Sequence, residues 1–251
     1  MQNRYVGDVG DFGKYGMLRA LFGSRHRLGI VWYLVPDEQQ TNDGRHIDYL
    51  NRPDFAACDP DLFEAMKTII GSGQRHIRNV EQSGLFPPGT IYYSRPLSPD
   101  TPANRSASQR TRFREDWLQE AVQTVTGCDA VFCDPDNGLE TPTVGKHDCR
   151  AVKYIFYDEV EQFLSAADTV VLYHHFSRQG SHLSQARLRT ETLRKLAGPA
   201  RRVLTLRFQP YSPRAYFIMT KEKTIPERIK KFACSVWKHC FQIIEQEPNP
   251  K

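Results

Sequence analysis

Short apolar runs alternate along the chain with segments in which apolar residues recur at the spacing of an amphipathic helix. The apolar runs predict strands at Leu28–Val35, Thr90–Tyr93, Asp129–Cys133, Thr169–His174, Val203–Phe208 and Ala215–Thr220. The helical pattern predicts helices at Asp11–Phe22, Asp59–Val80, Gln109–Val125, Asp158–Ala166, His182–Leu196 and Pro226–Ile244. Strands that alternate with helices are typical of a mainly parallel sheet with helices on both faces.

The last two predicted strands are joined by residues 209–214 alone. Because this connection is too short for a crossover helix, we expect the pair to be antiparallel. The pattern therefore predicts an α/β fold, with residues 1–251 in a single three-layer Rossmann-like domain whose mostly parallel sheet has a C-terminal antiparallel hairpin. The Pro- and Ser-containing residues 94–109 are expected to form a mobile loop, and the polar tail 245–251 is expected to fray.

Composition is that of a globular protein, with 39% hydrophobic and 25% charged residues. No stretch approaches the roughly 20 apolar residues of a membrane span, and the N-terminus lacks the apolar core of a signal peptide. We therefore expect a cytoplasmic protein with no membrane partner. The six cysteines form no CxxC pair, so we expect reduced thiols rather than disulfides or a zinc site.

The formal net charge of +5 permits a nucleic-acid or nucleotide partner without establishing one. Basic residues concentrate in two polar segments, Arg105–Arg114 and Arg187–Arg202. Such segments are commonly solvated helix faces. They are also compatible with a surface whose guanidinium groups bind phosphates.

Residues 129–140, Asp-Ala-Val-Phe-Cys-Asp-Pro-Asp-Asn-Gly-Leu-Glu, are the most informative stretch. An apolar strand ends there in a turn that carries Asp134, Asp136, Asn137 and Glu140. Ligands of open parallel sheets bind outside the carboxyl ends of strands, so this turn is predicted to face a binding crevice. The alternative is a structural turn, since each of these residue types favours turns.

Four glycines at positions 7, 10, 13 and 16 lie near the N-terminus. Their spacing lets backbone amides approach a ligand, and Asp11 is predicted to cap the helix that carries Lys14. Amides at a helix start together with a lysine suit a carboxylate or a phosphate. The alternative is a tight N-terminal segment that packs against the sheet.

Two other predicted strands end in polar residues. Leu28–Val35 is followed by Asp37 but by no glycine-rich turn of the kind that binds dinucleotides. The strand that ends at His174 continues into His175 and Arg178, which suit a general base and a phosphate contact. Adjacent strand residues point to opposite faces, so at most one of the two histidines is expected to face the crevice.

Three motifs, in this order, resemble the bacterial 23S rRNA adenine-N6 methyltransferase family and its class I relatives. Residues 7–15, Gly-Asp-Val-Gly-Asp-Phe-Gly-Lys-Tyr, are similar to the Gly-x-x-Ala-Asp-x-x-Lys-His segment that helps to hold S-adenosyl-methionine in that family. Residues 92–97, Tyr-Tyr-Ser-Arg-Pro-Leu, are similar to its Tyr-x-Gly-Ser-Pro-Leu element. Residues 134–137, Asp-Pro-Asp-Asn, take the place of its catalytic Asp-Pro-Pro-Tyr after a strand.

The resemblance, over about residues 7–220, implies a methyltransferase-like enzyme that acts on nucleic acid or a nucleotide. The catalytic residues it implies are Asp134, Asp136 and Asn137. The residues expected to contact the cofactor S-adenosyl-methionine are Asp11, Lys14, Tyr15, Asp37 and Ser94. His175 and Arg178 are expected to contact the substrate.

Two departures from the family pattern leave other functions open. Asp136 and Asn137 replace a proline and an aromatic residue, and no glycine-rich turn follows the first predicted strand. One alternative is a metal-dependent nuclease or phosphodiesterase in which Asp134, Asp136 and Glu140 bind Mg²⁺ or Mn²⁺. A second alternative is a non-catalytic nucleic-acid-binding protein whose contact surface is formed by the two basic segments.

Overall fold

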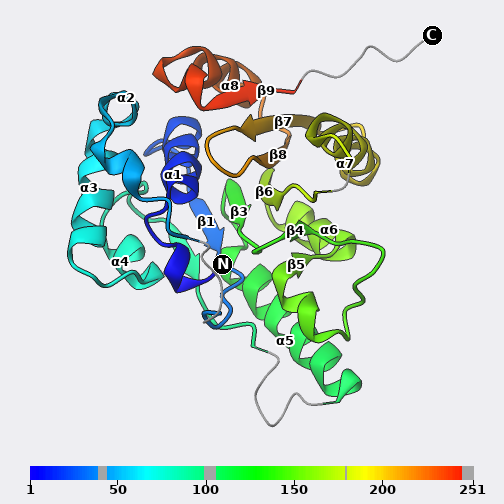
Figure 1. Cartoon of the computed structure of the whole chain (residues 1–251). Helices are drawn as coiled ribbons and strands as arrows, with labels where there is room; N and C mark the ends of the chain where they lie inside the picture. The colour runs from blue at the N-terminus through cyan, green and yellow to red at the C-terminus, as the bar shows by residue number, and fades with distance from the viewer. Residues whose placement is uncertain (39–43, 99–105, 179, 245–251) are drawn as a thin grey trace.

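The computed structural model describes residues 1–38, 44–98, 106–178 and 180–244 of the 251-residue chain. A seven-stranded sheet crosses the molecule, with helices on both of its faces (Figure 1). Its strands are β1 (Leu28–Val31), β2 (Ile91–Tyr93), β3 (Ala130–Cys133), β6 (Thr169–His175), β7 (Arg202–Phe208), β8 (Arg214–Thr220) and β9 (Phe241–Ile243). The short strands β4 (Gly138–Leu139) and β5 (Tyr154–Ile155) form a separate pair.

The α-helices of the described residues are α1 (Val9–Leu21), α2 (Pro53–Ala56), α3 (Pro60–Gly71), α4 (Ile77–Gln82), α5 (Ala107–Val125), α6 (Tyr157–Ala166), α7 (His182–Ala197) and α8 (Ile225–Cys234). Short 3₁₀ helices are η1 (Asn3–Tyr5), η2 (Asp48–Asn51), η4 (Cys149–Lys153) and η5 (Val236–His239). Over the part of the chain described, no helix has both the length and the apolar character needed to cross a membrane.

The strand order across the sheet is β2-β1-β3-β6-β8-β7-β9. β1 is parallel to β2 and β3, and β3 is parallel to β6. β8 is antiparallel to both β6 and β7, so the predicted α/β fold and its antiparallel hairpin are confirmed. The chain passes from β1 to β2 on one side and returns to β3 on the other. This reversal of strand order, at the carboxyl ends of β1 and β3, is where ligands bind in open α/β sheets.

Neighbouring rows of side chains in the sheet point to opposite faces. One fully buried row belongs to a core cluster shared with α1, α3, α4 and α8: Ile30, Phe132, Val171 and Ile218. The next row belongs to a cluster shared with α5, α6 and α7: Val31, Cys133, Leu172 and Phe217. Burial on both faces explains why the strands are continuous apolar runs.

Some predicted element boundaries are wrong. The strand predicted over Leu28–Val35 ends at Val31, and Tyr33 has a φ of +47°. The helix predicted over Asp59–Val80 is two helices, α3 and α4, because the chain turns at Gly73 with a φ of +71°.

The C-terminal helix is also shorter than predicted. Instead of extending over Pro226–Ile244 it ends at Cys234, and β9 pairs with β7. Helix α5 begins at Ala107, inside the loop predicted over residues 94–109. Residues 99–105 of that loop and the predicted tail 245–251 lie outside the described residues.

Helix α1 packs very close to its neighbours because three glycines form one of its faces. A Cβ atom would lie 1.5–2.4 Å from a side-chain atom at each position: Gly10 against Arg214, Gly13 against Phe208 and Gly16 against Trp237. Real Cβ atoms do not approach this closely. Of the two interpretations of the glycine spacing, close packing is therefore the one that the structure shows for these three positions.

Gly13→Ala is expected to lower the free energy of unfolding by about 1–3 kcal/mol, because the added methyl group overlaps the Phe208 ring and forces the core to shift. Gly71, the last residue of α3, is the matched control, since nothing lies within 4 Å of a Cβ atom there. Gly71→Ala should leave stability unchanged or raise it by up to about 1 kcal/mol. Urea denaturation measures both. Equal stabilities would contradict the close packing of α1.

Candidate functional site

A cavity of about 380 Å³ opens at the sheet edge where β3 and β6 end and β8 begins. Its walls come from the start of α1, the segment around Gly44 and His46, and the turns that follow β3 and β6. The side chains that carry its chemistry are Asp8, Asp11, Lys14, His46, Asp134, Asp136, Asn137, Tyr173, His175, Phe176, Arg178, His182 and Arg214. The N-terminal segment and the acidic turn therefore converge on one cavity, as the sequence led us to expect.

The floor of the cavity contains a buried network of opposite charges. Lys14 Nζ lies 2.8 Å from Asp11 Oδ1 and 2.6 Å from Asp134 Oδ2, and all three residues are at most 3% exposed. Burial alone lowers the pKa of Lys14, but the two carboxylates outweigh burial and raise it, so the ammonium group stays charged. The helix cap is Asp8, whose carboxylate accepts a hydrogen bond from Asp11 N at 2.9 Å. The prediction of Asp11 as the cap is wrong.

Arg214, the first residue of β8, lies beside this network and is 7% exposed. Its Nε donates to Ser212 O at 3.0 Å, and its guanidinium lies 5.9 Å from the Tyr173 ring centre. The structure gives its two Nη nitrogens no hydrogen-bond acceptor among the described residues. A buried guanidinium that borders a cavity and has N–H donors without an acceptor is suited to bind a carboxylate or a phosphate.

The acidic turn after β3 is held by the N-terminal residues. The Met1 amino group lies 2.6 Å from Asp136 Oδ1, and Gln2 Nε2 donates to Asp136 Oδ2 at 2.6 Å. Burial raises the pKa of Asp136, but the Met1 ammonium and these hydrogen bonds outweigh burial and lower it. Asn137 O accepts a hydrogen bond from His175 N at 3.2 Å, which joins the turns after β3 and β6.

Glu140 does not join the other carboxylates. It follows β4, and its Oε1 accepts a hydrogen bond from Tyr157 N at 2.8 Å, at the start of α6. Among the described residues, no group of three His, Cys, Asp or Glu ligands gathers at this edge of the sheet. The structure therefore does not assemble the Mg²⁺ or Mn²⁺ site expected from Asp134, Asp136 and Glu140.

The two histidines at the end of β6 face opposite ways, as predicted. His175 borders the cavity. His174 is 5% exposed on the other face, and its Nδ1 accepts a hydrogen bond from Leu139 N at 3.1 Å. Burial, with a smaller effect of Arg189, lowers the pKa of His174 to about 3, so this ring is neutral.

Three of the five residues expected to contact the cofactor lie outside the cavity lining. Tyr15 is buried behind Asp11, to which its hydroxyl donates at 3.0 Å. Asp37 is exposed and accepts a hydrogen bond from Arg4 N. Ser94 follows β2 and is partly buried. Asp11 and Lys14 are the two that border the cavity.

The two basic segments include structural arginines. Arg114 is 4% exposed, pairs with Glu159 (Nη2 to Oε2, 2.9 Å) and donates to Ala151 O at 2.9 Å. It joins α5 to α6 and is not part of a phosphate-binding surface. Arg189 donates to the Tyr157 hydroxyl at 2.8 Å. Arg105 lies outside the described residues.

Arg214, Tyr173 and Phe176 line the cavity but were not predicted from the sequence. Arg214 had a usable signal. An antiparallel strand begins at the sheet edge where its parallel neighbours end. If the second strand of the predicted hairpin is the antiparallel one, its first residue, Arg214, lies at the edge that carries the acidic turn.

Comparison of the chain with known proteins adds no family assignment to this geometry. No protein-family model matches the chain, and no curated protein matches it.

The buried neutral state of His174 predicts a specific pH dependence of stability. Between its ordinary pKa of 6.5 and its folded value of about 3, the unfolded chain binds a proton that the folded chain does not. Protonation of the unfolded chain at His174 therefore has little effect on the free energy of unfolding above pH 6.5. As the pH falls from 7 to 5, it lowers the free energy of unfolding by about 2 kcal/mol.

His174→Asn keeps an acceptor for Leu139 N–H but cannot titrate, so this loss should be absent in the variant. His175→Asn, at the neighbouring position that borders the cavity, should lose stability as the wild type does. Denaturant unfolding at the two pH values measures each protein. The same loss in all three would show that His174 is not the group responsible.

Proposed function

We propose that this protein is a methyltransferase-like enzyme that acts on a nucleic acid or a nucleotide, with the cavity at the end of β3 as its active site. The strand order supports the proposal, because β8 lies antiparallel between β6 and β7. Class I methyltransferases end their sheets with a hairpin of this kind. The sheet and the helices on its two faces are, in this proposal, a three-layer Rossmann-like domain.

The observation that carries the proposal is the position of Asp134. It follows β3, next to the reversal of strand order, and lies on the floor of the cavity. Lys14 Nζ donates a hydrogen bond to Asp134 Oδ2. Asp134 Oδ1 is therefore the oxygen that would accept a hydrogen bond from an amino group of a bound base. Burial raises the pKa of Asp134, and the Lys14 ammonium opposes that rise. Asp134 would orient the amino group that receives the methyl group.

An aromatic wall beside Asp134 supports recognition of a base. In the family that the sequence resembles, an aromatic residue stands at the position of Asn137. Here Phe176 borders the cavity from the segment after β6 and stacks on His182, with ring centres 4.7 Å apart. Tyr173 adds a second ring. Stacking on aromatic side chains is the common way in which proteins hold an unpaired base.

The charges on the floor suit the amino-acid end of S-adenosyl-methionine, which supplies an electrophilic methyl group when bound. Asp8 uses one carboxylate oxygen as the helix cap, and its other oxygen is available for an ammonium group. The Nη nitrogens of Arg214 suit a carboxylate. Between the ends of β1 and β3, where such cofactors ordinarily lie, Met1 donates to Tyr33 O and Asp134 O. The cofactor would therefore lie over β3, β6 and β8.

The proposal is tested by measuring thermal stability and calorimetric binding with S-adenosyl-methionine, S-adenosyl-homocysteine, nucleoside monophosphates, Mg²⁺ and Mn²⁺. At about 100 times Kd, a bound cofactor adds about 2.7 kcal/mol, a rise in melting temperature of roughly 5–10 °C for a chain of this size. Arg214→Lys keeps the buried charge but loses the planar fork, so cofactor affinity should fall about tenfold to a hundredfold.

Arg202→Lys, an exposed arginine on the same hairpin, is the matched control and should bind as the wild type does. Absence of a shift with either adenosyl compound would contradict the proposal. A shift with divalent ions alone would favour a phosphodiesterase. Salt-sensitive nucleic-acid binding that survives Asp134→Asn would favour a protein without catalysis.

A further inference from the structure

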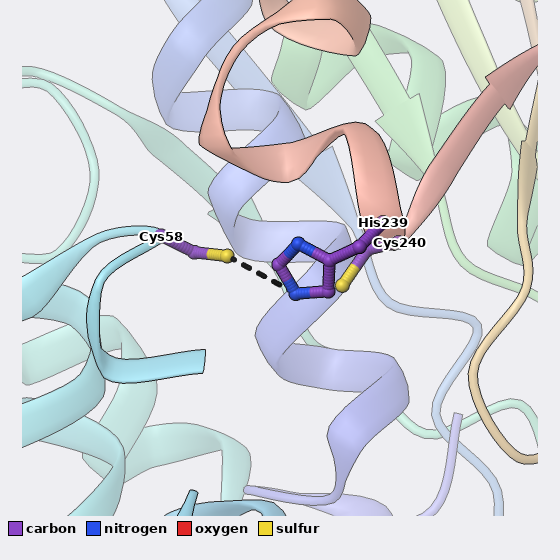
Figure 2. A group of neighbouring side chains, drawn as sticks. All are labelled: Cys58, His239 and Cys240. Carbon is purple, nitrogen blue, oxygen red and sulfur yellow. Dashed lines mark hydrogen bonds between the residues drawn. The ribbon is translucent and has the colours of Figure 1, made fainter. Parts of the chain in front are cut away.

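Two cysteines and a histidine lie together outside the cavity, although they are remote in sequence. Cys58 follows α2, and His239 and Cys240 join η5 to β9, 181 or more residues later. Figure 2 shows the His239 ring beside the two thiols, with its Nε2 joined to Cys58 Sγ by the dashed line. One ligand atom from each residue lies within 4.8 Å of the other two, and none of the three borders the cavity.

We propose that Cys58, His239 and Cys240 hold a zinc ion, with Asp54 as the fourth ligand. Sulfur and imidazole nitrogen are the ligands that Zn²⁺ prefers, in tetrahedral sites. With Zn–S about 2.3 Å and Zn–N about 2.0–2.1 Å, the edge between such ligands is about 3.6 Å. The separation of Cys58 Sγ from His239 Nε2 is 3.8 Å, so the pair needs little movement to bind one ion.

Asp54 is the candidate for the fourth ligand, although its carboxylate is not among the atoms that lie within 4.8 Å of one another and has to move towards them. Its Oδ2 lies 3.8 Å from His239 Nε2, and its backbone oxygen accepts a hydrogen bond from Cys58 Sγ at 3.4 Å. The carboxylate is paired with Arg52 at 2.6 Å in an ion pair in which both side chains are at least 43% exposed. Exposed pairs of this kind contribute little, so the carboxylate can exchange this partner for a metal ion.

Charge and solvent access also suit the ion. Binding converts two thiols to thiolates and releases two protons to solvent, while His239 binds through the lone pair of Nε2. Two thiolates and one carboxylate leave the zinc site with one net negative charge, which Arg52 can balance. Cys240 is fully buried and Cys58 is 8% exposed, whereas the His239 side chain is 36% exposed and gives the ion a path from solvent.

A zinc ion here would join the α2–α3 segment to the C-terminal η5–β9 segment. These segments already meet through the His239 and Phe55 rings, whose centres are 5.7 Å apart. The role is structural, because four protein ligands leave no open position for a substrate. It is also independent of the proposed function.

The test uses the full chain without a histidine tag, purified under reducing conditions with zinc present and then dialysed against metal-free buffer. We expect one zinc per chain by elemental analysis. Cobalt added to the metal-free protein should give the visible absorption of tetrahedral, thiolate-bound Co²⁺. His239→Ala, at an exposed position, should lower zinc affinity more than about a hundredfold, and Cys58→Ser should do the same.

The matched controls are His147→Ala and Cys234→Ser, which change the same residue types at exposed positions outside the cluster. Both should keep one zinc per chain. Wild-type protein without bound zinc, unchanged zinc content in His239→Ala, or a Cys58–Cys240 disulfide found by mass spectrometry would overturn the proposal. Unchanged affinity in Asp54→Asn would overturn the assignment of the fourth ligand.

Discussion

The buried contact between the Lys14 ammonium and the Asp134 carboxylate joins the first helix to the centre of the sheet and forms the floor of the cavity. Both groups are removed from water, so the loss of either one removes an opposite charge that stabilises the other. Removing one partner of such a pair ordinarily costs about 3–5 kcal/mol. The contact requires α1 to lie close to the sheet, and the glycine face of α1 permits this approach. Fold and site therefore depend on the same constraint.

The direction of the strands explains which side chains meet at the cavity. The carboxyl ends of the parallel strands β3 and β6 deliver Asp134 and His175 to one edge of the sheet. β8 is antiparallel to β6, so its first residue, Arg214, lies at that same edge, paired with His175. Helix α1 then adds Lys14. The cavity thus combines carboxylates, cations and aromatic rings from segments that are far apart in the sequence.

Local sequence patterns were sufficient for much of the fold. Apolar runs identified the strands of the central sheet except β9, because burial on both faces requires continuous apolar residues. β9 was missed because Phe241–Ile243 is a strand only through its pairing with β7, which is a tertiary contact. The apolar residues of this segment are spaced as in an amphipathic helix, which is why a helix was predicted there, but the segment forms a strand.

The candidate site was predicted in part, for similar reasons. A polar turn after an apolar strand correctly identified Asp134 and its neighbours as cavity residues. Glu140 was assigned wrongly, because β4 directs it to the start of α6, and no pattern in residues 134–140 reveals that pairing. The cluster of Cys58, His239 and Cys240 has no spacing signature, since its two halves meet only in the folded chain.

A crystal structure of the protein with S-adenosyl-homocysteine tests most directly whether the cavity above Asp134 is the active site, because it locates the ligand. We expect the amino-acid end of the ligand between Asp8 and Arg214, with its sulfur on the side of Asp134. Ligand density elsewhere on the molecule, or between the ends of β1 and β3 with Met1 displaced, would contradict the assignment.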